Sequence, residues 1–259
     1  MPEMPTGKEA NKHSADDHQP GIGNIASVLT QGAEILGICL PPRAFSSFEH
    51  YYDLLLQRGQ RTNLTAIDGA ADVARLHFLD SIALLGASRF EGRRVIDIGS
   101  GAGFPGVPLK IAEPTIDLTL LDATGKRIAF LSDLCAALGI GAAFVHSRAE
   151  EAAHESTMRE SYDIALARAV AKLNVLCELC LPFVRVGGKF LAMKAIDSNE
   201  EISDASYAIS ALGGKLAGFY DYPIPMTDMT RRVVIINKTE PTKSEYPRRF
   251  AKIQNKPLI

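Results

Sequence analysis

No stretch of this sequence approaches the ~18 consecutive apolar residues that a membrane span needs. Residues 1–19 are polar and contain no apolar segment after a basic start, so they do not resemble an export signal. The formal net charge is only −2, so no overall basic field points to a nucleic-acid partner. These absences predict a cytoplasmic protein that does not bind membranes. With 46% hydrophobic and 22% charged residues, the composition is that of an ordinary globular chain.

Cysteine is also scarce, since Cys39, Cys135, Cys177 and Cys180 are the only four. In the cytoplasm we expect these thiols to be reduced. Cys177 and Cys180 form a C-x-x-C pair, but a zinc site needs about four ligands and the sequence has no second such pair. Because apolar residues recur around the pair at helical spacing, we predict two core residues of one helix and no metal.

Basic residues are concentrated near the end of the sequence. From residue 231 onward there are eight basic residues and two acidic ones, which gives a local charge of +6. The basic residues are Arg231, Arg232, Lys238, Lys243, Arg248, Arg249, Lys252 and Lys256. Such a cluster indicates either a local contact with a polyanion or a solvated tail, and the charge alone leaves both open.

The first third of the sequence carries helical patterns and no strand signal. Residues 1–23 are polar and contain prolines, which predicts a flexible arm. Residues 24–90 predict a helical subdomain of three helices. We expect the second helix, which begins near Phe45, to end at Gly59, and the third to span residues 71–85.

From residue 94 onward, short apolar runs alternate with helical segments. The expected strands are residues 95–98, 118–122, 143–145, 162–167, 189–193 and 233–236. Nearly continuous apolar strands that alternate with helices are typical of a mostly parallel sheet covered on both faces. We therefore predict an α/β fold, with residues 91–240 as a nucleotide-binding domain and residues 241–259 as a basic C-terminal tail on the surface.

A glycine-rich segment, residues 97–106 (DIGSGAGFPG), follows the first expected strand and precedes a helix. Glycines here allow a sharp turn and the close approach of a ligand to the backbone. Gly101, Gly103 and Gly106 satisfy the pattern G-x-G-x-x-G, and Asp122 ends the second expected strand. A carboxylate in that place can bind the ribose hydroxyls of either NAD or S-adenosylmethionine, so this pair predicts a nucleoside cofactor without naming it.

Asp97 favours S-adenosylmethionine over NAD. It lies inside the first expected strand, and a buried carboxylate needs a charged partner or a hydrogen-bond donor. S-Adenosylmethionine brings an ammonium group close to such a loop, whereas NAD brings a pyrophosphate that the carboxylate would repel. The alternative is a purely structural role, in which Asp97 only accepts hydrogen bonds from the loop backbone. A methyltransferase is thus favoured over an NAD(P)-dependent oxidoreductase, for whose hydride transfer no residues are evident.

Further short motifs occur in a fixed order along the chain. They are residues 63–67 (NLTAI), 77–81 (HFLDS), 97–106, 121–122 followed by 126–127, 147–150 (SRAE), 167–169 (ARA), 246–249 (YPRR) and 257–258 (PL). In this order, from about Phe45 to the end of the chain, they resemble the bacterial RsmG (GidB) family of 16S ribosomal RNA guanine-N7 methyltransferases. The glycine loop alone marks only the superfamily, whereas the motifs before it, Arg168 and the YPR segment are far more specific.

The resemblance implies a Rossmann-like class I methyltransferase fold, S-adenosyl-L-methionine as cofactor and 16S ribosomal RNA of the small subunit as partner. The cofactor-binding residues it indicates, together with the loop, are Gly99, Gly101, Gly103, Phe104, Asp122, Ala149, Glu150 and Arg168. Ala149 and Glu150 are expected beside the adenine. For RNA binding we predict Lys194, Arg231, Arg248 and Arg249. We expect the protein to be a monomer.

Two departures separate this chain from the family pattern. Arg58-Gly59 stands where the family has Trp-Asn, and the chain contains no tryptophan at all. Lys194-Ala195 stands where the family has Lys-Gly. Both positions lie outside the cofactor loop, so they could alter how RNA is held without affecting the cofactor.

Methylation of guanine N7 needs no general base, because N7 carries a lone pair and no proton at neutral pH. The enzyme must align N7, the methyl group and the sulfur, so the sequence assigns no catalytic residue. His77, Asp80 and Ser81 lie on one helix and do not form a hydrolase triad, whose members come from separate elements. We expect them to hold the helical region against the cofactor loop. Whether they touch the substrate is left open.

A non-catalytic RNA-binding or ribosome assembly factor with the same fold is the remaining alternative. It predicts a broken cofactor loop, whereas Asp97, Gly99, Gly101, Gly103 and Asp122 are all present. The sequence does not indicate which guanosine is modified, or whether the substrate is bare RNA or an assembled subunit.

Overall fold

The computed structural model of the chain describes residues 22–62, 69–168 and 171–259. Residues 1–21 of the predicted arm lie outside these ranges. The motif at residues 63–67 and Ala169 also lie outside them. None of the helices in the described ranges is long and apolar enough to cross a membrane.

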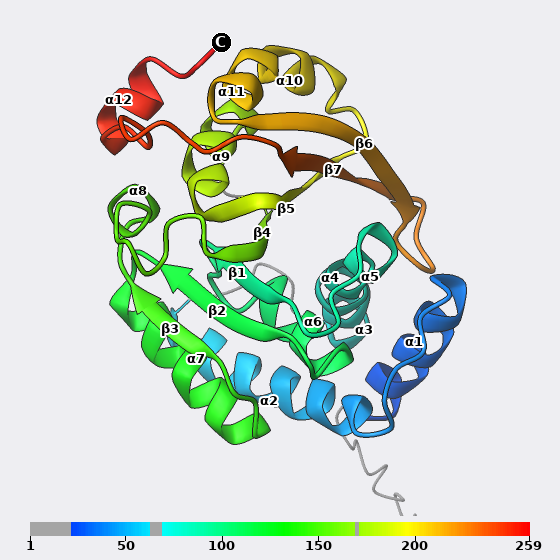
Figure 1. Cartoon of the computed structure of the whole chain (residues 1–259). Coiled ribbons are helices and arrows are strands. Elements are labelled where there is room, and N and C mark those ends of the chain that lie inside the picture. The colour runs from blue at the N-terminus through cyan, green and yellow to red at the C-terminus, as the bar shows by residue number, and fades with distance from the viewer. Residues whose placement is uncertain (1–21, 63–68, 169–170) are drawn as a thin grey trace, which may run out of the picture.

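Seven strands form one sheet in the order β3-β2-β1-β4-β5-β7-β6 (Figure 1). Their bounds are β1 (Arg94–Ile98), β2 (Asp117–Asp122), β3 (Ala143–His146), β4 (Tyr162–Arg168), β5 (Val184–Ala195), β6 (Gly214–Pro223) and β7 (Thr230–Lys238). Strands β1 to β5 pair in parallel, and β7 lies antiparallel between β5 and β6. Central parallel strands are covered on both faces and are therefore rich in apolar residues along their whole length. The predicted α/β fold is confirmed.

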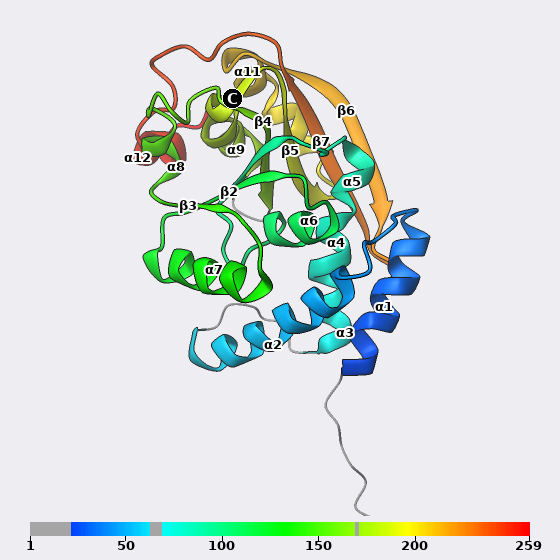
Figure 2. The same ribbon diagram turned by 60° about the horizontal axis from the view of Figure 1, so that its bottom comes forward.

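Helices cover both faces of the sheet (Figures 1 and 2). The first face carries α1 (Ile22–Ile35), α2 (Ala44–Thr62), α6 (Gly106–Ala112) and α7 (Gly125–Leu138), and the second carries α8 (Ala149–Ala152), α9 (Leu173–Cys180), η2 (Leu181–Phe183), α10 (Asn199–Asp204), α11 (Ser206–Ala211) and α12 (Phe250–Asn255). Val95 belongs to the apolar core of the first face and Ile96 to that of the second. Successive side chains of a strand point to opposite faces, so each face buries its own core.

The N-terminal helices share the core of the first face, where Phe48 and Phe78 pack with Val95. The third predicted helix begins as α3 (Ala70–Val73), passes through a π-helical turn, η1 (Ala74–Leu79), continues as α4 (Asp80–Ile82) and is followed by α5 (Leu84–Ala87). The expected end of the second helix at Gly59 is wrong, because α2 continues to Thr62. One glycine costs a helix only about 1 kcal/mol, which an otherwise regular helix can absorb.

Strand β6 has no counterpart among the predicted strands. It lies at the edge of the sheet, so its residues 214–223 are exposed or half-buried, apart from the buried Tyr222, and do not form an apolar run. A register shift between Leu216 and Gly218 interrupts the pattern further. A search for nearly continuous apolar runs, which identifies buried parallel strands, therefore misses β6.

The C-x-x-C pair lies on α9, where Cys177 and Cys180 are both fully buried. Burial raises the pKa of both thiols, so they stay protonated. Within the described ranges no group of three or more His, Cys, Asp or Glu side chains could hold a metal ion. The interpretation of this pair as core residues is confirmed.

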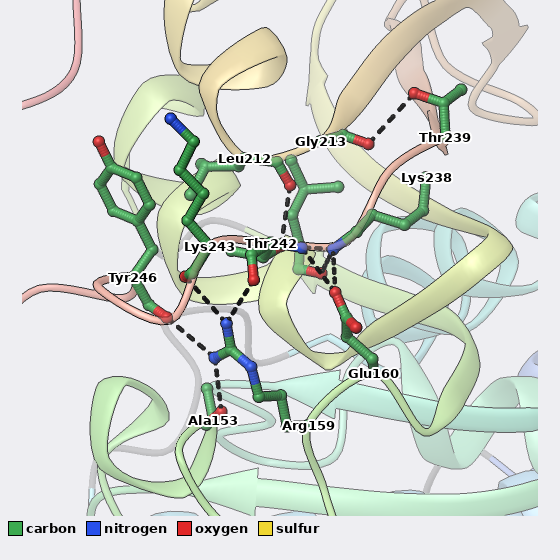
Figure 3. Close-up of polar contacts among 11 residues, drawn as sticks. Ala153, Arg159, Glu160, Leu212, Gly213, Lys238, Thr239, Thr242, Lys243 and Tyr246 are labelled. Atoms are coloured by element: carbon green, nitrogen blue, oxygen red, sulfur yellow. Dashed lines mark hydrogen bonds and ion pairs between the residues drawn. The ribbon is translucent and has the colours of Figure 1, made fainter.

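Residues 241–259 are mostly exposed, but polar contacts and a few buried side chains attach them to the second face (Figure 3). The guanidinium of Arg159 donates hydrogen bonds to the carbonyls of Tyr246 at 2.9 Å and Thr242 at 2.8 Å. Lys238 is buried and forms an ion pair with Glu160 at 3.1 Å. Further along, Ile253 and Leu258 join the core of the second face. The segment is therefore exposed along most of its length but is fixed to the fold at Thr242, Ile253 and Leu258, which are buried.

Candidate functional site

The glycine loop connects the end of β1 to α6 and turns back over the end of β2. The Gly99 amide donates to the carbonyl of Leu121 at 2.8 Å, and Gly99 has φ 74°, in the left-handed region that favours glycine. A Cβ atom on Gly103 would lie 2.4 Å from the hydroxyl oxygen of Tyr51, which itself donates to the carbonyl of Ala102 at 2.6 Å. Glycine is therefore needed at both positions, at Gly99 for backbone conformation and at Gly103 for space.

Asp97 is fully buried beneath this loop. Its Oδ2 accepts a hydrogen bond from the Gly106 amide at 3.0 Å, so the carboxylate does tie down the loop. Its Oδ1 has no hydrogen-bond partner among the described residues. Burial raises the pKa of Asp97 to about 7, because the charged form loses its hydration. One carboxylate oxygen thus stays free for a donor or a cation.

Asp122 lies at the end of β2 and holds two loops together. Its Oδ2 accepts from the Gly101 amide at 3.0 Å, and its Oδ1 accepts from the Thr124 amide at 2.8 Å. Arg127 approaches Oδ2 to 3.4 Å. The carboxylate is therefore fixed in orientation at the carboxyl edge of the sheet, where ligands bind in open parallel sheets.

A cavity of about 620 Å³ opens beside these two loops. Of the residues predicted to bind the cofactor, those that line it are Gly99, Gly101, Phe104, Asp122, Ala149, Glu150 and Arg168. Gly103 does not line it and instead packs beneath the loop against Tyr51. Residues at or after the ends of four strands, β1 to β4, thus surround one space, which we call the cofactor cavity.

Arg168 ends β4 and lies on the wall of the cofactor cavity. Its Nη1 donates to Asp80 Oδ2 at 2.9 Å and to the Leu76 carbonyl of the π-helical turn at 3.3 Å. The acidic partner of Arg168 is therefore Asp80. The Asp80 carboxylate is buried, so the pair lies in a medium of low polarity and each charge stabilises the other.

His77 and Phe104 complete this wall. Their rings stack with centroids 4.5 Å apart, and the Arg168 guanidinium carbon lies 5.0 Å from the centre of the Phe104 ring. Burial and the neighbouring Arg168 charge lower the pKa of His77 to about 4, so the imidazole is neutral at pH 7. A neutral ring can accept at Nδ1 from Arg168 Nη2 at 3.1 Å, which leaves the proton on Nε2. Nε2 has no hydrogen-bond partner in the described parts of the chain.

A second cavity of about 390 Å³ lies on the other side of Arg168. We call it the acceptor cavity. Its lining consists of Leu76, His77, Asp80, Arg168, Met193, Lys194, Ala195, Met229 and Arg231. His77 and Arg168 line both cavities, so the two spaces meet at these side chains.

The residues predicted to bind RNA fall into different surroundings. Lys194 and Arg231 line the acceptor cavity, and Lys194 forms an ion pair with Glu201 at 2.6 Å. Arg249 is exposed. Arg248 instead holds the buried Glu178 carboxylate through Nε at 2.8 Å and Nη2 at 2.7 Å. The Arg248 guanidinium therefore forms an internal ion pair with Glu178, a contact it would have to break to bind RNA.

Several residues of these cavities could not be predicted from local sequence patterns. Tyr222 on the unpredicted β6 donates to Asp80 Oδ1 at 2.7 Å and so supports the Arg168 pair. Met229 and Phe250 line the acceptor cavity and the cofactor cavity, respectively. None of them belongs to a short motif, and only the packing of distant segments brings them to the site.

The fold and the site define the class of protein. A sheet of order β3-β2-β1-β4-β5-β7-β6 with β7 antiparallel, a glycine loop after β1 and an acid at the end of β2 define a class I S-adenosylmethionine-dependent methyltransferase. The solved structure of PH0851 has this likeness at the level of the fold, with a TM-score of 0.50 and 15% identity over 61% of this chain and 45% of that one.

Within this class, the chain belongs to the family described as rRNA small subunit methyltransferase G (GidB), whose model matches residues 44–220. Ribosomal RNA small subunit methyltransferase G of Alkaliphilus oremlandii is 44% identical over 237 residues, which cover 90% of this chain and 99% of that one. The protein of the same name from Caldanaerobacter subterraneus subsp. tengcongensis is 43% identical over 233 residues, 89% of this chain and 97% of that one. The family resemblance read from the motifs is confirmed.

Proposed function

We propose that this protein transfers the methyl group of S-adenosylmethionine to N7 of a guanosine in the 16S ribosomal RNA of the small subunit. The observation that carries the proposal is the junction of two cavities at Arg168 and His77. A methyl donor in the first cavity and an acceptor base in the second would meet there, as a direct transfer requires.

The residues present fit this cofactor. Asp97 offers one buried carboxylate oxygen without a partner, and Asp122 is fixed at the edge of the cofactor cavity. Ala149 and Glu150 would border the adenine, while Gly99 leaves room for a ligand against the loop backbone. When bound, S-adenosylmethionine supplies a methyl group activated by a positively charged sulfur.

The acceptor cavity suits a base that becomes positively charged. Guanine N7 needs no general base, and positive charge moves onto the purine as it is methylated. Asp80 neutralises Arg168, so the cation nearest the junction does not face the ring unpaired. Arg168 would orient the base through O6 or a phosphate rather than N7 itself, because N7 must stay free to react.

Contact with the RNA backbone would come from the rim of the acceptor cavity. Arg231 forms no ion pair with any residue in the described ranges, and the exposed Arg249 lies on the same basic segment. Lys194 would join them by exchanging its contact with Glu201. Contacts of this kind make RNA binding weaker as salt concentration rises. We further propose that the protein acts as a cytoplasmic monomer.

Two other functions agree less well with the site. An NAD(P)-dependent oxidoreductase is not favoured, because the chain belongs to a family of rRNA methyltransferases. A non-catalytic assembly factor would not need an intact cofactor cavity. Here the glycine loop and Asp122 are hydrogen-bonded to each other and line such a cavity. Neither is favoured.

The test is to incubate the pure protein with methyl-labelled S-adenosylmethionine and unmodified small ribosomal subunits, or their extracted RNA, and to identify the labelled nucleoside after digestion. We expect label in 7-methylguanosine. Label in another nucleoside would keep the methyltransferase and overturn the target atom. Cofactor binding without any label would overturn the proposed substrate.

A further inference from the structure

The C-terminal helix α12 contributes a wall to the cofactor cavity. Phe250, its first residue, lines the cavity together with Leu179 of α9 and Arg148 at the start of α8. Neither the glycine loop nor the acid at the end of β2 belongs to this part of the wall. It lies at the end of the cavity where Ala149 and Glu150 would border the adenine.

Arg148, which also lines the cavity, packs over the Phe250 ring. The guanidinium carbon of Arg148 lies 5.1 Å from the ring centre, a cation–π contact, and Arg148 Nη1 lies 3.7 Å from Glu150 Oε1. Phe250 is therefore connected through Arg148 to Glu150, a residue expected at the adenine. This places an aromatic face and a carboxylate on the same end of one cavity.

The position of Phe250 is fixed by the segment that precedes it. Arg248 donates from its backbone amide and its guanidinium to Glu178, which is fully buried on α9 next to Leu179. The carbonyl of Pro247 lies 2.9 Å from His154 Nε2, and Ile253 of α12 is fully buried. These contacts hold Phe250 in place at the cavity through the fold of the protein itself.

We propose that Phe250 is a cofactor-binding residue that closes the adenine end of the cavity, so that the C-terminal segment is part of the cofactor site. This inference rests on the proposed function, since it takes S-adenosylmethionine as the occupant. Adenine is flat and largely apolar on its faces, and an aromatic side chain beside it removes that surface from water while it contributes a stacking or edge contact.

The experiment is to measure the dissociation constants of S-adenosylhomocysteine and of adenosine by calorimetry for the full chain and for Phe250→Ala and Phe250→Leu. We expect Phe250→Ala to weaken both ligands by about tenfold and Phe250→Leu by less, because leucine keeps apolar area without the flat ring. Phe219→Ala is the matched control. Phe219 also carries an arginine over its ring, Arg232 at 4.7 Å, but it lies on β6 and does not line the cofactor cavity.

Each outcome decides something different. Unchanged binding in Phe250→Ala, or a loss for S-adenosylhomocysteine with none for adenosine, would overturn the adenine-end assignment. Should Phe250→Ala fail to fold, as judged from its thermal melt, the Phe250→Leu variant carries the same test. If the unaltered protein binds neither ligand, the proposed cofactor is wrong and the inference fails with it.

Discussion

The two cavities that meet at Arg168 are built in different ways. Much of the cofactor cavity is formed by backbone and short loops at the ends of β1, β2 and β3, each contiguous in sequence. The acceptor cavity is formed by side chains from the π-helical turn, α4, β4, β5 and the β6–β7 connection with the start of β7. A site made from local loops leaves short motifs, whereas a site made from distant side chains leaves scattered residues.

The shared wall makes the comparison testable. Arg168 and His77 belong to both cavities, while Gly99 belongs only to the first and Arg231 only to the second. Substitutions on either side of the wall should therefore separate cofactor binding from methyl transfer.

Gly99→Asp should remove measurable binding of S-adenosylhomocysteine while the fold and RNA binding remain. The new side chain would enter the cofactor cavity from a position with φ 74°. Gly92→Asp is the control, since Gly92 has φ 65° with nothing within 4 Å of an added Cβ atom and lies outside the cavity. Calorimetry and a thermal melt measure both variants, and undiminished binding in Gly99→Asp would sink the assignment of this cavity.

Arg248→Ala should lower the free energy of unfolding by about 3–5 kcal/mol, because Glu178 would keep a buried charge without its partner. Arg231→Ala should leave stability nearly unchanged and instead weaken RNA binding and reduce its dependence on salt. Chemical denaturation and RNA titrations at several salt concentrations distinguish the two. If Arg248→Ala is as stable as the unaltered protein and only RNA binding falls, the tail acts as the sequence alone suggested.

Arg168→Ala should lower kcat for methyl transfer by roughly 100-fold, the usual loss when an oriented polar group leaves a reaction site. S-Adenosylhomocysteine should bind with a smaller change, because the loop contacts remain. Arg185→Ala is the control, since Arg185 pairs with Asp163 at 2.6 Å near the opposite ends of β4 and β5. Steady-state kinetics with saturating cofactor provide the measurement, and equal losses in both variants would assign Arg168 a structural role only.

Tyr222→Phe should cost about 1 kcal/mol of stability and lower kcat less than Arg168→Ala does, because it removes one hydrogen bond to Asp80. Tyr220→Phe provides the comparison, as Tyr220 stacks on Tyr222 with ring centroids 5.7 Å apart but has no hydrogen bond to Asp80. If the two variants have the same kcat, Tyr222 does not position Arg168 through Asp80.

Stability without ligand should also depend on pH through Asp97, whose pKa burial raises from 3.8 to about 7. A raised carboxyl pKa in the fold favours the protonated form, so its contribution is complete below the unfolded pKa and is lost as pH rises through about 7. The free energy of unfolding without ligand should therefore fall from about pH 4 to about pH 7 relative to Asp97→Asn. Parallel curves for the two proteins would contradict this assignment.

Several features were predictable from residues close together in the chain. The alternation of apolar strands and helices after residue 94 led to the parallel sheet, and the glycine loop with Asp122 indicated a nucleoside site. The family motifs identified the relatives that the comparison then confirmed. Each of these signals depends on spacing within one element or one turn, which the sequence records directly.

The tertiary structure alone decided which distant groups meet. Asp80 contacts Tyr222 across 142 positions and Arg248 contacts Glu178 across 70, although neither pair is marked by any local pattern. The sequence by itself therefore determined the fold class, the family and the cofactor loop. Only the folded chain determined that Arg168 pairs with Asp80 at the junction of two cavities and that the basic C-terminal segment is bound to the core, because a buried charge takes whichever partner the packing brings to it.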